Sequence, residues 1–139
     1  MRSYVVRCFC EPVEAVDTPD PVPTGTEVVV EVTRCGVCHS DLHLQEGFYD
    51  LGGGRKLSLA DRGVQLPLVM GHEVLGRVIA KGPEAALGDD AIGRDVLVYP
   101  WLGCGKCEAC LRGAENDCTV SNSIDVFRPG GYAEKCVVP

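Results

Sequence analysis

The sequence predicts a mainly β, barrel-like domain with short helices and one inserted cysteine-rich lobe. Three observations favour this class: short apolar segments recur along the 139 residues, turn-forming residues separate them, and cysteines cluster in one later segment. With 17 glycines and 9 prolines the chain turns often, so long helices are not expected. Hydrophobic residues are 45% and charged residues 24% of the chain, which excludes a disordered or fibrous protein.

The first expected elements are two strands joined by a stiff connection. Segment 4–10 is a short apolar run typical of a buried strand. Segment 17–25 contains three prolines and continues neither a strand nor a helix. From Glu27 to Arg34, valines alternate with polar residues, which predicts a strand with one solvent-facing side, although Val29 breaks the alternation.

A short helix and a loop are expected next. Segment 40–45 favours a helix that is capped by Ser40 or Asp41. The glycine-rich segment 48–63, mixed in charge, is predicted to be a loop. Later strands are expected at 73–81, 95–99 and 132–138, with Gly-Pro and Pro-Gly-Gly turns between them.

Four cysteines in the lobe at 103–118 have metal-ligand spacing. Cys104, Cys107, Cys110 and Cys118 form a C-x2-C-x2-C-x7-C pattern. Four thiolates satisfy the tetrahedral preference of Zn²⁺ and leave no open position, so this site is predicted to be structural. Buried or disulfide-linked cysteines and an iron–sulfur cluster are the alternatives, although the usual C-x3-C-P ending of a cluster motif is absent.

All three histidines lie close to a cysteine or a glutamate. Cys38 and His72 carry sulfur and nitrogen donors that suit a catalytic zinc, which keeps one position open for water or substrate. Asp41 and Glu73 suit the outer shell, where a carboxylate orients a ligating imidazole. Two alternatives remain open at this point: His72 as an ordinary core histidine, and Cys35-Gly-Val-Cys38 as a thioredoxin-like redox motif.

Charge and composition limit the partners. The formal net charge is −7, which disfavours binding to nucleic acid, and there is no polybasic patch for a membrane surface. No apolar run approaches the roughly 20 residues of a membrane span. Arg7 interrupts the segment in which a secretion signal would need its apolar core, so a cytoplasmic protein is expected.

Three motifs together resemble the zinc-containing alcohol dehydrogenases of the medium-chain dehydrogenase/reductase family. They are Cys-Gly-Val-Cys-His-Ser-Asp at 35–41, Gly-His-Glu at 71–73, and the lobe cysteines at 104–118, followed by Gly-Gly-Tyr-Ala-Glu at 130–134. The resemblance runs through essentially the whole chain. It implies a partly open GroES-like β-barrel over residues 1–139, the N-terminal part of a catalytic domain.

The same resemblance implies roles for individual residues. Cys38 and His72 would hold the catalytic zinc, and the four lobe cysteines the structural zinc. Ser40 and His43 would relay the alcohol proton, and His39 would face the cofactor pyrophosphate. Two outer-shell groups complete the implied site: Asp41, which would hold His72, and Glu73, behind the zinc.

The resemblance also implies parts that this sequence does not show. No G-x-G-x-x-G motif is present, so a Rossmann domain for NAD or NADP is expected to lie outside this chain. The third catalytic-zinc ligand is likewise expected downstream. The chain alone is therefore predicted to be inactive, whereas the full-length protein would oxidise a small-molecule alcohol to an aldehyde or ketone as a homo-oligomer, dimer or tetramer. A stand-alone zinc or interaction module is the main alternative, and a C-x-x-C redox protein a weaker one.

Overall fold

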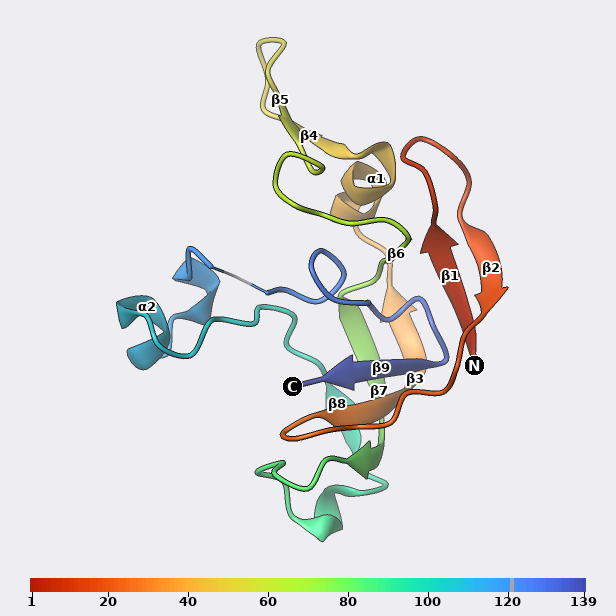
Figure 1. Cartoon of the computed structure of the whole chain (residues 1–139), viewed down its shortest axis with the longest axis vertical. Helices are drawn as coiled ribbons and strands as arrows, with labels where there is room; N and C mark the ends of the chain where they lie inside the picture. The colour runs from red at the N-terminus through yellow and green to blue at the C-terminus, as the bar shows by residue number, and fades with distance from the viewer. Residues whose placement is uncertain (121) are drawn as a thin grey trace.

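In the computed structural model, which describes residues 1–120 and 122–139, strands dominate and all helices are short (Figure 1). The elements are β1 (Arg2–Val6), β2 (Glu14–Asp17), β3 (Val28–Gly36), α1 (His39–Glu46), β4 (Phe48–Asp50), β5 (Lys56–Ser58), β6 (Leu68–Val69), β7 (Glu73–Lys81), η1 (Asp89–Ala91), β8 (Asp95–Leu97), α2 (Glu108–Leu111), η2 (Glu115–Asp117) and β9 (Lys135–Val138). The mainly β class predicted from the sequence is confirmed. The strands form three open sheets, and no closed barrel is present in the described part of the chain.

A four-stranded antiparallel sheet in the order β8-β7-β3-β9 forms the centre of the molecule. Its longest pairing joins β3 to β7, from Val28 opposite Lys81 to Gly36 opposite Glu73. This register matters for function, because the end of β3 leads into Cys38 and the start of β7 follows His72. Two segments that are more than 30 residues apart in sequence therefore meet at one end of the sheet.

The first residues of β3 explain the break in the valine alternation. Val28, Val29 and Val30 are all buried, and the register shifts between Val29 and Val30. Because β3 pairs with β7 on one side and β9 on the other, its beginning is internal to the sheet. The burial of three consecutive valines shows that both faces of β3 are covered here. A strand covered on both faces carries a continuous apolar run, so this part of β3 lacks the predicted solvent-facing side.

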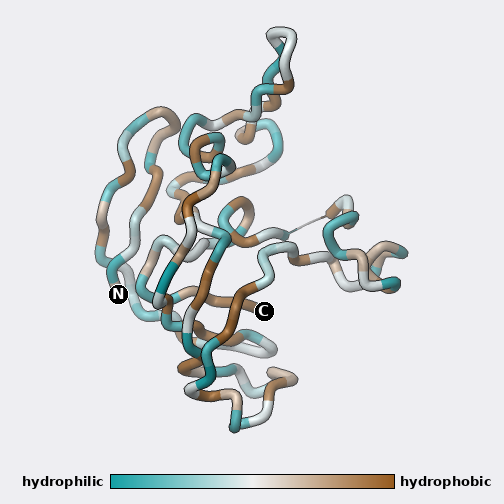
Figure 2. Tube along the Cα trace, turned by 180° about the vertical axis from the view of Figure 1, so that it is seen from behind, coloured by the Kyte–Doolittle hydropathy of each residue, from teal (hydrophilic) through white to brown (hydrophobic). Residues whose placement is uncertain are grey.

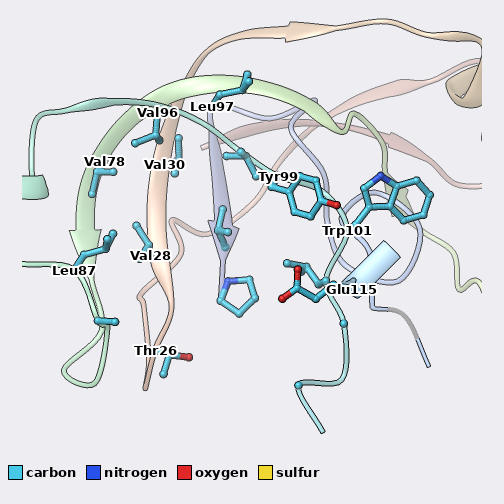
Figure 3. Close-up of a pocket in the computed structure, with 17 residues that line it drawn as sticks. Thr26, Val28, Val30, Val78, Leu87, Val96, Leu97, Tyr99, Trp101 and Glu115 are labelled. Atoms are coloured by element: carbon cyan, nitrogen blue, oxygen red, sulfur yellow. The ribbon is translucent and has the colours of Figure 1, made fainter. Parts of the chain in front are cut away.

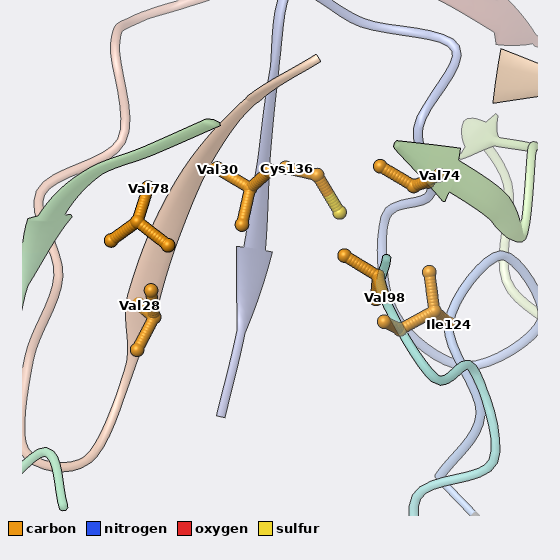
Figure 4. Packing of buried hydrophobic residues seen from close by; sticks show 7 residues of the cluster. All are labelled: Val28, Val30, Val74, Val78, Val98, Ile124 and Cys136. Atoms are coloured by element: carbon orange, nitrogen blue, oxygen red, sulfur yellow. The ribbon is translucent and has the colours of Figure 1, made fainter. Parts of the chain in front are cut away.

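Two hydrophobic clusters stabilise the fold. The first lies on the central sheet and contains Val28, Val30, Val74, Val78, Val98, Ile124 and Cys136 (Figure 4). The second lies where α1 packs on the β2-β1-β6 sheet and contains Val6, Leu44, Leu59, Val64, Leu68 and Met70. Burial of each such aliphatic side chain contributes about 1.5–3 kcal/mol. Figure 2 shows hydrophobic residues concentrated along the central strands.

Four predicted elements differ from the structure, and two of them, the strands expected at 95–99 and 132–138, are simply shorter, as β8 and β9. The strand expected at 4–10 ends at Val6, and bends and turns follow it. Segment 48–63 is not a plain loop, because β4 and β5 pair as a hairpin that projects from the sheets (Figure 1). The glycines form its turn: Asp50 accepts a hydrogen bond from the N–H of Gly52, and Leu51 and Arg55 close the turn through their backbones. Glycines that suggested a loop thus supply a tight reversal between two strands.

No helix in the described residues is long and apolar enough to cross a membrane.

Candidate metal centres

The four lobe cysteines converge on one point. The Sγ atoms of Cys107 and Cys110 lie 3.4 Å apart, those of Cys107 and Cys118 3.8 Å, and those of Cys104 and Cys110 4.0 Å. All four sulfurs lie within 4.8 Å of one another. A tetrahedron with Zn–S bonds of about 2.3 Å has sulfurs roughly 3.8 Å apart, so the spacing fits a zinc ion.

Local structure holds the lobe in this shape. Cys107 precedes the single turn of α2, and the N–H of Leu111 donates to the carbonyl of Cys107. At the base of the lobe the N–H of Asn122 donates to the carbonyl of Leu102, 2.7 Å away. The lobe extends to the side of the central sheet (Figure 1). Few of its residues are buried, so a metal ion is the natural stabilising centre for this segment.

The lobe thiols also differ in acidity. Backbone N–H groups of Lys106 and Cys107 lower the pKa of Cys104 to about 6. Desolvation and the neighbouring Cys107 thiol raise the pKa of Cys110. Thiols this close cannot all ionise without a cation between them, which is the electrostatic condition that a divalent metal satisfies.

The second centre joins Cys38 and His72. Sγ of Cys38 lies 3.2 Å from Nε2 of His72, although 34 residues separate them in the chain. Glu73 offers a carboxylate oxygen to the same group, in which all donor atoms lie within 4.8 Å. The Glu73 side chain is exposed, at the edge of the pair. The structure thus brings together two donor types that zinc accepts.

Cys38 is also the N-cap of α1. Its sulfur accepts a hydrogen bond from the backbone N–H of Ser40, and the carboxylate of Asp41 accepts one from the N–H of Cys38, 2.8 Å away. This reciprocal arrangement is a capping box. The predicted caps, Ser40 and Asp41, are therefore wrong by two and three residues, because the thiol occupies the capping position. Hydrogen bonds from Ser40 and the charge of His72 lower the pKa of Cys38.

The carboxylate on His72 is Asp125, and not the expected Asp41. Nδ1 of His72 hydrogen-bonds to Oδ2 of Asp125, and the Asp125 side chain is buried. Burial raises the pKa of Asp125 to about 6 in spite of this bond. Burial alone would lower the pKa of His72, but the bond to Asp125 and the nearby negative groups outweigh it, so the pKa is raised. No motif marked Asp125 in the sequence; its contact depends on the folded path of segment 122–131.

The expected relay residues lie on the first turns of α1. Ser40 lines a cavity of about 590 Å³ that also contains His72. The ring centroid of His43 lies 4.5 Å from that of His39 and 5.0 Å from that of Tyr49. Nδ1 of His43 is buried and has no hydrogen-bond partner among the described residues. His39, the first residue of the helix, is exposed.

Both polar and apolar side chains line the 590 Å³ cavity. The polar and charged residues that line it are Ser40, Asp50, Arg62, His72, Asn116, Ser123 and Asp125. Its apolar walls are formed by Leu44, Tyr49, Leu51, Leu57, Pro100, Trp101, Ile124, Val126 and Phe127. An apolar pocket with a few converging polar groups is typical of a small-molecule site. Trp101, about half exposed, lies in its wall.

A second cavity, of about 610 Å³, lies between the central sheet and the cysteine lobe, which contributes Gly103, Gly105 and Glu115 to its lining (Figure 3). Valines of β3, β7 and β8 line it together with Leu87, Leu97, Tyr99 and Trp101, and Glu115 is its one carboxylate. It contains none of the metal-ligand candidates. Its chemistry is therefore that of an apolar surface.

Comparison with known proteins assigns the family. Residues 24–139 match the family model described as the alcohol dehydrogenase GroES-like domain. The chain belongs to this family. The GroES-like architecture implied by the sequence motifs is thereby confirmed, and the open sheets are consistent with the predicted partly open barrel.

Individual relatives of this GroES-like domain are dehydrogenases. Over 143 residues the chain is 35% identical to the NAD-dependent alcohol dehydrogenase of Sulfurisphaera tokodaii, covering all of this chain and 38% of that protein. It is 34% identical over 142 residues to the L-threonine 3-dehydrogenase of Saccharopolyspora erythraea, covering all of this chain and 37% of that protein. A cobalt- and zinc-bound thermostable alcohol dehydrogenase from Pyrobaculum aerophilum superposes with a TM-score of 0.79 at 30% identity, covering all of this chain and 39% of that structure. The chain thus spans less than two fifths of the length of these relatives.

Proposed function

We propose that this chain is the zinc-binding, N-terminal catalytic-domain part of a zinc-dependent, NAD(P)-dependent alcohol dehydrogenase. The observation that carries the proposal is the Cys38–His72 pair, 3.2 Å apart, whose His72 lines a largely apolar cavity in a GroES-like domain. Full-length relatives named as alcohol dehydrogenases, one of them with bound zinc and cobalt, support the same assignment.

Two zinc ions have distinct places in this proposal. Cys104, Cys107, Cys110 and Cys118 would hold a structural ion, because four protein ligands leave no position for a substrate. Cys38 and His72 would hold the catalytic ion together with a ligand from elsewhere in the parent protein. When bound there, zinc acidifies the hydroxyl of an alcohol, as it does a bound water.

The chain's own residues would bind the alcohol and conduct its proton. Ser40 lines the same cavity as His72 and can accept the hydroxyl proton as it passes its own proton on. His43, one turn later on α1, is the next group that can carry it toward solvent. The apolar walls would hold the carbon skeleton and exclude water. His39, exposed beside His43, would meet the anionic part of a nicotinamide cofactor.

Further properties of the parent protein belong to the same proposal. Residues 1–139 would form one GroES-like unit, with a separate Rossmann domain for NAD or NADP. The parent protein would act in the cytoplasm on a small-molecule alcohol, as a homo-oligomer, and this unit alone would have no turnover. The net charge of −7 supports a small-molecule rather than a nucleic-acid partner.

Zinc analysis of purified chains tests the proposal. We expect one tightly held zinc per chain and a second, weaker one. Cys107→Ser should remove the tight ion and Cys38→Ser the weak one, while Cys8→Ser, at an exposed thiol, should change neither. A stand-alone zinc module predicts that Cys38→Ser has no effect on metal content. A redox protein predicts instead a reversible Cys35–Cys38 disulfide at a physiological potential.

A further inference from the structure

Asp125 has a backbone conformation that side chains rarely adopt. Its φ is +72°, in the left-handed region, and Cys10 is the only other non-glycine residue in the described chain with a positive φ. Such a conformation costs of order 1–3 kcal/mol and persists where the surroundings enforce it. Here the N–H of Asp125 donates to the carbonyl of Arg128, 2.8 Å away, and Ile124 forms a bridge with Arg128. Glycine would fit the position without strain.

The side chain gains one specific contact from this conformation. Asp125 is only 2% exposed, and its Oδ2 accepts a hydrogen bond from Nδ1 of His72. Removing a carboxylate from water is costly unless it is paired. A strained backbone and a buried acid thus occur together at the residue that hydrogen-bonds Nδ1 of His72.

The Asp41 carboxylate binds the main chain of Cys38 and not the His72 ring. Its Oδ2 accepts the backbone N–H of Cys38, and its Oδ1 is buried with no hydrogen-bond partner in the described structure. One carboxylate oxygen of Asp41, one of Asp125 and a ring nitrogen of His72 lie within 4.8 Å of one another. Each residue of the Cys38–His72 pair is therefore held by its own carboxylate: Cys38 by Asp41 through the main chain, and His72 by Asp125 through the ring.

We propose that Asp125 is a positioning residue for the metal site, which fixes the ring and tautomer of His72 so that Nε2 faces Cys38. This inference rests on the proposed function, because it assigns a ligand role to His72. A proton held on Nδ1 by a carboxylate leaves the lone pair of Nε2 free for a metal ion. Without Asp125, the ring can rotate or carry its proton on Nε2.

The left-handed backbone gives an unusually clean test. Asp125→Gly removes the carboxylate and also relieves the backbone strain, so loss of positioning is separated from loss of folding. Asp125→Asn keeps the shape and an acceptor oxygen but removes the charge. Cys10→Gly is the matched control, because Cys10 has a φ of +63° and lies exposed outside the site.

Two measurements report the role. In chains whose lobe is filled with zinc, Co²⁺ titration with detection of sulfur-to-cobalt absorption gives the affinity of the Cys38–His72 site. We expect Asp125→Gly to weaken Co²⁺ binding about 10–100-fold, Asp125→Asn to weaken it less, and Cys10→Gly to leave it unchanged. In metal-free chains, ¹⁵N shifts of the His72 ring should show protonated Nδ1 in the unmodified protein and a mixture of tautomers in Asp125→Gly.

Unchanged Co²⁺ affinity and unchanged His72 shifts in a folded Asp125→Gly variant would overturn the proposal, and would mean that Asp41 or solvent holds the ring. If the unmodified chain gives no sulfur-to-cobalt absorption, the proposed catalytic site fails. The ring shifts then still decide whether Asp125 positions His72. A fall in affinity with no change in the ring shifts would also count against positioning, since the carboxylate would then act only through its charge.

Discussion

Sγ of Cys38 lies 3.2 Å from Nε2 of His72, and the β3–β7 register places them there. Cys38 follows the last residue pair of that register by two positions, and His72 precedes it by one. The site therefore depends on the end of the central sheet, so substitutions that disturb this end should affect the metal pair as well as stability.

Gly71 is a crowded backbone position with a positive φ next to this pair. Its φ is +95°, and an added Cβ would lie 2.6 Å from the Tyr132 ring and 2.8 Å from Sγ of Cys35. Gly71→Ala should therefore cost about 2 kcal/mol or more in unfolding free energy and weaken metal binding by His72. Gly52→Ala is the matched control: φ is +77° and no atom lies within 4 Å, so only strain of about 1 kcal/mol is expected. Urea unfolding measures both, and equal losses would contradict the crowding argument.

The lobe should depend on its metal. Cys104→Ser removes one of four converging thiols, so we expect loss of the tightly bound zinc and a fall in Tm on the order of 10 °C, equivalent to ~3 kcal/mol. Chelation of the unmodified chain should give the same fall. Metal analysis and calorimetry check this. Cys8→Ser, at an exposed thiol, serves as the control, and an unaltered metal content and Tm in Cys104→Ser would exclude the lobe site.

Cys35 and Cys38 should differ in reactivity. Burial raises the pKa of Cys35 to about 11, whereas hydrogen bonds from Ser40 lower the pKa of Cys38 below its usual value of 9.0. Because the thiolate is the nucleophile, iodoacetamide should modify Cys38 first in metal-free protein at pH 7–8. The rate at Cys38 should level off at a lower pH than the rate at Cys35, which should still rise at pH 10. Peptide mapping by mass spectrometry distinguishes the two sites, and faster reaction at Cys35 would refute the assignment.

The capping box should stabilise α1 through Asp41. Asp41→Ala removes the acceptor of the Cys38 N–H and should cost about 1 kcal/mol, with faster amide exchange at Cys38 and in the first turn. Asp41→Asn keeps an acceptor and should recover most of this loss. Asp61→Ala, an exposed change outside the helix, should have little effect. If Asp41→Ala leaves exchange at Cys38 unchanged, the side chain does not cap the helix.

Local patterns predicted much of this protein. The strand at 73–81 has the bounds predicted from the sequence, with a Gly-Pro turn after it, and the C-x2-C-x2-C-x7-C spacing predicts the convergence of four sulfurs. Both predictions depend on short-range geometry. Successive side chains of a strand point to opposite faces, and C-x2-C turns place neighbouring sulfurs on one side of the chain. The glycine-rich hairpin was missed because glycine permits both a loop and a tight turn.

The partner of His72 could be decided only by tertiary structure. Asp41 lies in a recognisable motif, but its carboxylate is used locally, three residues back, by the N–H of Cys38. Asp125 lies 53 residues from His72 and in no pattern, and a left-handed turn in a distant segment brings it to the ring. The sequence by itself determined which donor atoms this chain offers to a metal. The fold decided which buried acid faces which donor, because that depends on long-range packing and on a backbone conformation that no local residue pattern specifies.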